Sequence, residues 1–539
     1  MRNAVFHSRC LTLAGCIAWT WLALPAPGDE AKKEPGDKFF TEPAARMFRF
    51  EISETALTQL RRSPRTYVPA TVREGDRVLT NVAVRIKGMG SFRSIDEKPS
   101  LAVKFDEFAT NQHYRGLNKL MFNNSVQDRT YLAEMLATQM FRDAGVPASR
   151  CTHARVQLNG RDLGLYVVME AMNKQFLKQH FANANGNLYE AYLLDVNARM
   201  EQDGGEPGNQ SDVRALYSAS RIADPAERWR QLNRVLDVDR FVSFVAMEML
   251  TSHWDGYAIH TNNYRIYHEP VSDKFVFITH GIDWAFRRPT ISIQPPTKSI
   301  VGRAVLSTPE GQKQYNERIG TLFTNVFKVP VITNRMEQAL AKIRGAGLSA
   351  TELVNIERRA GRLREQIQTR AANVANQLRG IDPEPMKFDP QNYAYPKEWR
   401  DEPDRGEPLM DRVKLDGKNT LHIQARNEST RASWRSQVYL VRGWYRFEGA
   451  ARTDALTRGS ARLRISGDTR SIGISGTGGG WRLLSHDFEV QDAGMDVEFV
   501  CELNAIQGEV WFDVDSFRVK RLAPGEARPL GVRRPILEQ

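Results

Sequence analysis

Long hydrophobic runs are scarce in this 539-residue sequence. A helix that spans a bilayer needs roughly 20 apolar residues, and the apolar stretch from Leu11 to Leu24 is shorter. Basic residues precede this stretch, and a segment rich in proline and glycine, residues 25–28, follows it. This layout is typical of a secretory signal peptide. We therefore expect residues 1–28 to be a signal peptide and the mature protein to be exported, without a transmembrane span, to the periplasm, cell surface or medium.

Cysteine is also scarce, with four residues in the whole chain. Cys10 and Cys16 lie in the leader, where Cys16 ends a lipoprotein-type box, so a lipid anchor is the alternative to simple cleavage. Cys151 and Cys501 are the other two, and they fall in different expected domains. The sequence therefore predicts neither a disulfide framework nor a Cys-x-x-Cys metal site.

Motifs for nucleic-acid binding and paired-histidine motifs for metal binding are absent as well. The 75 Lys and Arg residues exceed the 64 Asp and Glu residues, for a net charge of +11, but they are dispersed along the chain. This excess of positive charge favours anionic binding partners such as phosphates or acidic polysaccharide. We do not expect nucleic acid as a partner.

Hydrophobic periodicity predicts an α+β domain of roughly 330 residues, followed by an all-β domain. Alternating apolar and polar residues predict strands, and apolar residues at three- to four-residue steps predict helices. The expected strands are 47–53, 78–87, 101–105, 154–158 and 164–169, and the expected helices are 129–144, 239–253, 310–327, 331–346 and 350–379.

Proline marks the expected boundary between the two domains. Residues 381–409 hold many prolines among charged residues, which predicts an extended linker. Residues 410–522 then contain short apolar runs separated by Gly, Asn and Asp, a spacing typical of a β-sandwich. Residues 523–539 are expected to be a tail.

The amino-terminal half of the first domain carries a glycine-containing turn and two candidate lysines. Lys87 precedes Gly88, Gly90 and Ser91, and glycines in such a turn let backbone amides approach an anion closely. An ordinary β-turn is the alternative interpretation. Lys104 lies in an apolar strand, where an ammonium needs either a surface-facing side or an anionic partner. Glu134, on the helix that follows, could supply that carboxylate.

Polar residues that could serve phosphoryl transfer continue through the second half of the domain. Asp255 is followed seven and eight residues later by Asn262 and Asn263, and Asp283 follows an apolar strand. Asp255 and the asparagines could instead serve turns and caps. A purely structural role is harder to assign to Asp283. Burying a carboxylate in so apolar a segment costs free energy unless it is paired or bound to a cation.

The order of these parts is that of a kinase-type site: glycine loop, lysine, helix glutamate, hinge, Asp with a downstream Asn, and a second Asp. Phosphoryl transfer needs positioning, charge neutralisation and hard oxygen ligands for a metal, and these residue types supply them. Together the segments resemble the CotH kinases. These are atypical protein kinases found among exported bacterial proteins and fungal surface proteins. The segments that carry the resemblance are 87–91, 98–105, 159–170, 255–264 and 281–286.

The resemblance covers about residues 45–380 and implies a two-lobed kinase-like domain that phosphorylates protein Ser or Thr with ATP and Mg²⁺ or Mn²⁺. By position, Lys104 or its rival Lys87 would contact the phosphates. The backbone of the hinge, the segment from Glu170 to Met172, would line the adenine site. Asp255 would orient or deprotonate the acceptor hydroxyl.

The same resemblance implies that Asp283 and either Asn262 or Asn263 would hold the metal. The offset from Asp255 to the asparagines is longer than in ordinary protein kinases, and Gly-Ile-Asp-Trp replaces Asp-Phe-Gly. A non-catalytic surface or matrix protein on a kinase-like scaffold is therefore the alternative function. A metal-dependent hydrolase using Asp255 and Asp283 is a third hypothesis.

The second domain resembles jelly-roll carbohydrate-binding modules. The resemblance rests on Trp481 and on the closing run Trp511 to Asp513. It implies a possible polysaccharide partner, because exposed aromatic rings can stack on sugars. The alternative is that both tryptophans belong to the sandwich core.

Overall fold

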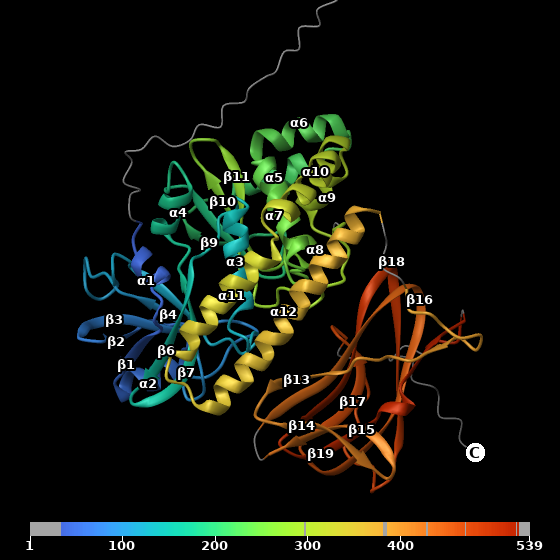
Figure 1. Cartoon of the computed structure of the whole chain (residues 1–539). Helices are drawn as coiled ribbons and strands as arrows, with labels where there is room; N and C mark the ends of the chain where they lie inside the picture. Colours follow the sequence, from blue (N-terminus) through green and yellow to red (C-terminus); the bar gives the residue numbers. More distant parts are fainter. Residues whose placement is uncertain are drawn as a thin grey trace, which may run out of the picture.

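The computed structural model describes residues 34–295, 298–380, 385–426, 429–468, 471–523 and 525–527. The expected signal peptide, the lipoprotein-type box and most of the expected tail lie outside these residues. Figure 1 shows three parts: a β-rich part in blue and teal, a helical part in green and yellow, and a β-rich part in orange and red. In the part of the chain that the structure describes, no helix combines the length and apolar character that crossing a bilayer requires.

The amino-terminal strands close into a barrel in the order β1-β2-β3-β4-β5-β7-β6. A parallel pairing between β1 and β6, from Arg46 opposite Ala154 to Phe50 opposite Leu158, completes the ring. Aromatic side chains fill it, with Phe48 and Phe122 edge to face at 5.1 Å between ring centroids. The strands are β1 (Arg46–Glu51), β2 (Val68–Glu74), β3 (Arg77–Lys87), β4 (Ser100–Lys104), β5 (Lys119–Asn123), β6 (Cys151–Leu158) and β7 (Arg161–Glu170).

Two short helices belong to this barrel: α1 (Asp37–Thr41) and α2 (Glu54–Arg62). Phe39 of α1 is buried in the barrel core. The folded domain therefore begins before residue 45, the expected boundary.

The helical part is built around a second sheet of order β11-β10-β8-β9. Helix α7 is buried along nearly all of its length, as its run of Val, Phe, Met and Leu requires. The strands are β8 (Asn187–Ala191), β9 (Glu201–Gly204), β10 (Tyr264–Glu269) and β11 (Lys274–Thr279). The helices are α3 (Ala133–Asp143), α4 (Lys174–His180), α5 (Ser211–Ser220), α6 (Pro225–Val235), α7 (Val238–Leu250), α8 (Tyr257–His260), α9 (Ile300–Leu306), α10 (Pro309–Asn325), α11 (Val329–Arg344) and α12 (Ala350–Leu378).

The carboxy-terminal part is a β-sandwich organised by two long strands, β16 with 28 residues and β18 with 24. A strand has only two edges, so β16 pairs with β13, β18, β19 and β20 by changing neighbours along its length. The elements are β12 (Tyr393–Ala394), β13 (Arg400–Arg405), β14 (Leu409–Leu415), β15 (Lys418–Ala425), β16 (Thr430–Thr457), β17 (Ser460–Ile465), β18 (Arg482–Ala505), β19 (Gln507–Asp513), η1 (Val514–Ser516) and β20 (Arg518–Arg521).

The expected linker over residues 381–409 is wrong for much of its length. Strands β12 and β13 pair with the sandwich, and Trp399 is 5% exposed within the sandwich core. The prolines misled the prediction because Pro403 lies in the short strand β13, where it faces Ala432 of β16. The folded carboxy-terminal domain therefore begins before residue 410.

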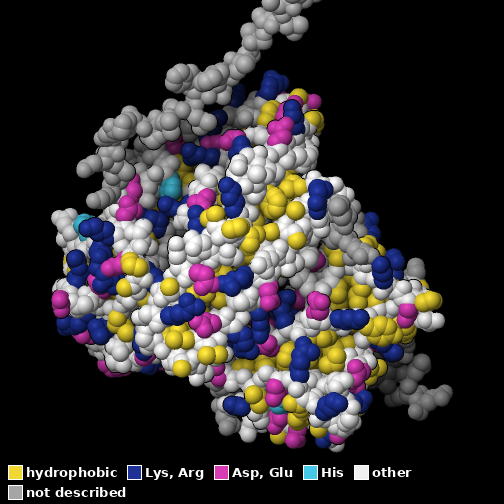
Figure 2. Space-filling view, in the orientation of Figure 1, with side chains coloured by type: hydrophobic (Ala, Val, Ile, Leu, Met, Phe, Trp, Pro, Cys, Tyr) yellow, Lys and Arg dark blue, Asp and Glu magenta, His cyan; other side chains and the backbone are white. Residues whose placement is uncertain are grey.

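The sandwich contacts the helical part through polar side chains. Arg362 of α12 donates to Asp401 at 2.6 Å, and Thr290 donates to Asp496 of β18. Figure 1 shows α12 running between the first two parts and the sandwich. Figure 2 shows Lys and Arg scattered over the visible face with Asp and Glu between them, in line with the dispersed basic residues of the sequence.

The expected mixture of helices and strands and the carboxy-terminal sandwich are confirmed at the level of architecture. The two-lobed kinase arrangement stays a prediction, since the amino-terminal strands form a closed barrel. The five expected helices correspond to α3, α7, α10, α11 and α12 with ends shifted by a few residues.

Candidate functional site

The candidate site begins where β3, β5 and α3 meet. The Nζ of Lys87, at the end of β3, donates to Oδ1 of Asn123. Nδ2 of Asn123 donates to Oε2 of Glu134 at 2.7 Å and approaches Sδ of Met169 at 3.0 Å. One amide therefore bridges the lysine and the glutamate. Asn123 was not among the predicted site residues, although an Asn-Asn pair at the end of a short apolar strand was a visible signal.

Lys104 is not the lysine beside Glu134, and the expected ion pair between them is wrong. Its Nζ binds the carboxylate of Glu107 instead, and its side chain is 37% exposed. In the antiparallel register, Lys104 faces Ala83 of β3, whereas Lys87 faces Ser100 at the other end of β4. The two lysines therefore lie at opposite ends of the β3–β4 pair.

Several acids crowd the other side of Lys87. Burial lowers the pKa of Lys87, while the charges of Glu134 and Asp283 act in the opposite direction. Burial raises the pKa of Glu134 above its usual range. Asp283 has its pKa raised well above the usual range by burial, and then by the carboxylates of Glu134 and Asp128. These acids repel one another and would gain from a bound cation.

Asp255 sits in a loop that both asparagines hold. Nδ2 of Asn263 donates to Oδ2 of Asp255 at 2.9 Å and to its carbonyl oxygen at 3.0 Å, and Asn262 approaches Oδ1 at 3.4 Å. Burial raises the pKa of Asp255, and the hydrogen bond from Asn262 opposes this. The structure therefore holds both asparagines in a hydrogen-bonded cluster with Asp255, and their expected metal site with Asp283 stays a prediction.

Two stacked indoles join the Asp255 loop to the Asp283 segment. The rings of Trp254 and Trp284 stack with centroids 4.9 Å apart. Each tryptophan is the chain neighbour of one of the acids, so the stack keeps Asp255 and Asp283 in one region. The sequence displays both tryptophans but cannot show that they meet.

A buried glutamate that the sequence analysis missed supports the same loop. Glu248 of α7 accepts from the backbone nitrogens of Tyr257 and Ala258 at 2.7 and 2.8 Å. Burial raises its pKa to about 8. A side chain at Gly256 would place a Cβ 2.3 Å from the Glu248 carboxylate. Gly256 is therefore needed for close approach.

The glycine-containing turn follows β3 directly. Gly88 has φ of +91°, which favours glycine, and Arg65 donates to its carbonyl oxygen. Asn124 donates to the carbonyl of Ser91 at 3.0 Å, and a Cβ at Gly90 would lie 3.3 Å from Gln127. The turn is thus held beside the loop that leads into α3, next to Lys87.

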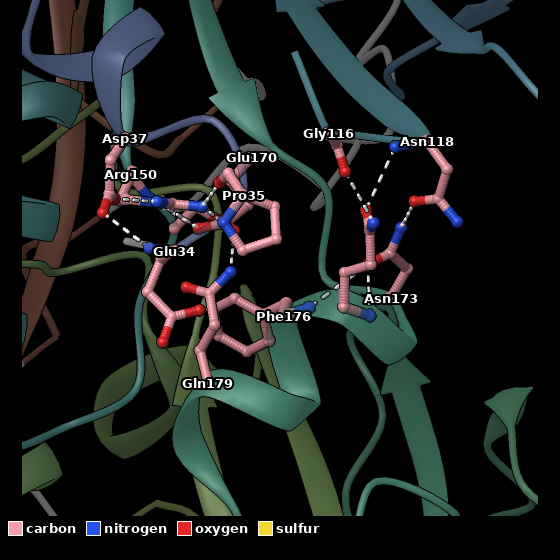
Figure 3. A network of polar contacts seen from close by, with 12 residues as sticks. Glu34, Pro35, Asp37, Gly116, Asn118, Arg150, Glu170, Asn173, Phe176 and Gln179 are labelled. Carbon is pink, nitrogen blue, oxygen red and sulfur yellow. Dashed lines mark hydrogen bonds and ion pairs between the residues drawn. The ribbon is translucent and has the colours of Figure 1, made fainter. Parts of the chain in front are cut away.

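The expected hinge from Glu170 to Met172 has structural partners. Figure 3 shows Arg150 between Glu170 and Asp37, with bonds of 2.9 Å from Nε of Arg150 to Glu170 and 2.5 Å from Nη1 to Asp37. The backbone nitrogen of Glu170 donates to the carbonyl of Arg150 at 2.9 Å. Neither the side chain nor the amide of Glu170 is therefore free for an adenine base, which corrects the assignment of Glu170. Met172 packs beside a small apolar cluster, and its role stays a prediction.

The residues present fit a divalent cation held partly by a ligand's phosphates. Oδ1 of Asn262 is buried without a hydrogen-bond partner, and Asp283 makes no side-chain hydrogen bond or ion pair within the described residues. Among those residues, no group of three or more His, Cys, Asp or Glu could hold a metal ion by itself. Mg²⁺ commonly binds one or two carboxylates together with substrate phosphates. One carboxylate and one amide oxygen suit that kind of site.

Comparison with known proteins gives several similarities. The sequence model of the CotH kinase protein family matches residues 84–380. Inner spore coat protein H of Bacillus subtilis (strain 168) is 22% identical over 41% of this chain and 63% of its own length. Spore coat protein homolog 1 of Rhizopus delemar is 24% identical over 24% of each chain. Invasin CotH2 of the same fungus is 21% identical over 31% of this chain and 32% of its own length.

Solved structures are similar to about a quarter of the chain. The structure of TmCBM61 in complex with beta-1,4-galactotriose shares 14% identity and a TM-score of 0.19 over 24% of this chain and 91% of that one. A family 35 carbohydrate binding module from Clostridium thermocellum shares 12% identity and a TM-score of 0.18 over 24% and 96% of the two chains.

The chain spans less than two thirds of the length of each curated relative described above. The match to the family model, however, covers more than half of this chain and contains Lys87, Glu134, Asp255 and Asp283. This chain therefore belongs to the CotH family.

Proposed function

We propose that this protein is an exported atypical kinase that transfers the γ-phosphoryl group of ATP to Ser or Thr of a protein acceptor. The observation that carries the proposal is the meeting of Lys87, Asn123 and Glu134 in one hydrogen-bonded chain. The charge of Asp283 acts on the same lysine. A lysine, a helix glutamate and a metal-binding acid are the parts that phosphoryl transfer requires.

Each polar residue has a role in this proposal. Lys87 binds phosphate oxygens, and Glu134 orients it through Asn123. Asp283 and the free Oδ1 of Asn262 hold Mg²⁺ or Mn²⁺, which neutralises charge on the phosphates when bound. Asp255, positioned by Asn263, accepts the proton of the acceptor hydroxyl, and its raised pKa favours that uptake. Gly88, Gly90 and Ser91 form the turn beside the phosphates.

A non-catalytic binding protein is the second candidate. The observation that favours it is that the Asp255 carboxylate already accepts hydrogen bonds from both asparagines. In that case the scaffold would bind a partner, and the sandwich could bind polysaccharide. A metal-dependent hydrolase is less supported, because the acids do not gather around a metal position among the described residues.

The test compares purified residues 30–539 with the variants Asp283→Ala and Asp255→Asn. Each is incubated with labelled ATP, Mg²⁺ or Mn²⁺ and a Ser-rich acceptor protein. We expect the wild type to label the acceptor and each variant to lose about 10²-fold or more of the rate. Lys104→Met is the matched control, since Lys104 binds Glu107 on a partly exposed surface. Equal labelling by all four proteins would remove the kinase proposal.

A further inference from the structure

A cavity of about 900 Å³ lies between the helical part and the sandwich. We call it the inter-domain cleft. On one side it is lined by Trp254, His260, Arg288 and Lys298, among others. On the other side it is lined by residues of the sandwich, including Tyr439, Trp444, Asp468, Asp487, Glu489 and Asp496. Neither part of the protein forms this cleft alone.

The cleft adjoins Asp255. Trp254 is its chain neighbour, and Nδ1 of His260 lies 2.7 Å from the carbonyl oxygen of Trp254. The guanidinium of Arg288 lies over the Trp254 ring at 4.2 Å from the centroid, and its charge acts on Asp255. Asp255 does not itself line the cleft, but His260 and Arg288 do, and the charges of both act on Asp255. A ligand in the cleft would therefore lie beside the Asp255 loop.

The two walls are held together by direct contacts. Thr290 donates to Asp496, and Nε2 of Gln437 lies 3.4 Å from the Thr290 hydroxyl. Arg287, beside the cleft residue Arg288, lies 3.7 Å from Glu402 of β13. The cleft is thus already formed in the folded chain, so ligand binding carries no free-energy cost for assembling it.

The walls differ in charge. Arg288 and Lys298 line the helical wall, whereas the sandwich wall presents four carboxylates. Part of that acidity is neutralised in place, since Arg446 binds Asp487 at 2.6 Å, but Glu489 is exposed on the wall. Opposed charged walls complement a ligand that carries both signs, as a polypeptide does.

We propose that the inter-domain cleft is the acceptor site, in which a Ser- or Thr-containing polypeptide segment lies between the sandwich and the Asp255 loop. This inference rests on the proposed function and adds that the sandwich forms half of the acceptor site. Trp444 and Tyr439 supply aromatic surface for the segment, and Glu489 supplies charge. The sandwich is then a substrate-binding element of the enzyme.

This assignment differs from the expected role of Trp481 and Trp511. Nε1 of Trp481 donates to Asp416 at 3.0 Å, and Trp511 stacks on His422 with centroids 5.0 Å apart. Neither residue lines the cleft. Trp481 is therefore a matched control for Trp444.

The experiment measures steady-state phosphorylation of a Ser-rich peptide with Lys and Glu at flanking positions, using residues 30–539. Acceptor-independent ATP hydrolysis is measured alongside. We expect Trp444→Ala and Glu489→Lys each to raise KM for the peptide about tenfold, with little change in ATP hydrolysis. Trp481→Ala should leave both values as in the wild type. Melting temperatures establish that each variant is folded.

A second measurement uses the fluorescence anisotropy of the same peptide, labelled, with neutral cello- and galacto-oligosaccharides as competitors. We expect no competition. Unchanged KM in both cleft variants, or displacement of the peptide by a neutral oligosaccharide, would overturn the acceptor-site proposal while leaving the kinase intact. A wild-type protein that neither hydrolyses ATP nor labels the peptide would overturn the proposed function and this inference together.

Discussion

Two groups of enclosed carboxylates in this protein behave in opposite ways. In the sandwich, Glu498 binds Arg400 and lies 3.1 Å from Arg435, and these charges lower its pKa to about 2. In the candidate site, burial raises the pKa of Glu134 and of Asp283. The charge of Asp128 adds to the rise at Glu134, and the charges of Glu134 and Asp128 add to it at Asp283. Both groups are largely shielded from water, so the difference lies in the partners.

This difference separates acids that stabilise the fold from acids kept for function. An enclosed carboxylate that is matched by arginines is part of the structure. An enclosed carboxylate beside other acids costs stability and persists where a ligand or cation completes it. Glu498 has its counter-charges in the folded chain, whereas Asp283 lacks a partner within the described residues.

The largest expected effect concerns Glu498, the enclosed acid that is matched by arginines. Glu498→Gln leaves Arg400 and Arg435 short of a counter-charge and should lower the free energy of unfolding by about 3 kcal/mol at pH 7. The folded pKa lies below the unfolded value of 4.5, so this loss should shrink as pH falls from 4.5 towards about 2. Urea unfolding at several pH values measures it. The exposed Glu489→Gln in the same strand is the control, and a loss below about 0.5 kcal/mol for Glu498→Gln would contradict the comparison.

The next effect concerns the lysine of the site. Lys87→Met should lower the rate of phosphorylation by about 10²-fold, because phosphate oxygens lose a charged donor. Lys104→Met removes a lysine from the same pair of strands and should leave the rate unchanged within about twofold, since a surface ion pair contributes little. The reverse result would return the phosphate-binding role to Lys104.

Divalent cations should act on the acids of the candidate site, through Asp283, and not on Glu498. With a non-hydrolysable ATP analogue present, Mg²⁺ at a hundred times its dissociation constant should raise the free energy of unfolding by about 2.7 kcal/mol. Asp283→Asn should lose most of this increase, and Glu489→Gln should keep it. Thermal unfolding with and without Mg²⁺ measures the effect. Equal stabilisation of Asp283→Asn would place the cation elsewhere.

The smallest effect tests whether an acid without a counter-charge costs stability even when it is fully hydrogen-bonded. Glu248 has a folded pKa of about 8 against 4.5 unfolded, so the folded state keeps a proton that the unfolded state releases. Its contribution should therefore fall by about 2 kcal/mol as pH rises from 5 to 7. Glu248→Gln should flatten this fall in urea unfolding. An unchanged pH slope would show that Glu248 is ionised in the fold.

The sequence predicted most of the long helices and many of the strands, because their periodicity is local. Helix α7 and helix α12 follow directly from runs of apolar residues at helical spacing. Strands β8 and β9 were missed because their signal covers only 5 and 4 residues. Helices α5 and α6 were also missed, although they span 10 and 11 residues. The linker was misjudged because proline content alone does not show that a short strand such as β13 pairs with a long one.

The candidate site was predictable in its residue types but not in its partners. Asp283 stood out because a carboxylate in an apolar segment is costly. The choice between Lys87 and Lys104 could not be made, because both end apolar strands in the sequence. Asn123 was missed because the Asn-Asn pair at the strand end does not show which distant groups its amide joins, here Lys87 and Glu134.

The sequence by itself determined the family, the alternation of helices and strands, and the presence of acids and lysines suited to phosphoryl transfer. These depend on residue type and short-range order. Only the tertiary structure decided that β1 pairs with β6 to close the barrel, and that Lys87 rather than Lys104 meets Glu134. Strand register and long-range packing make those choices, because they depend on which distant segments face each other.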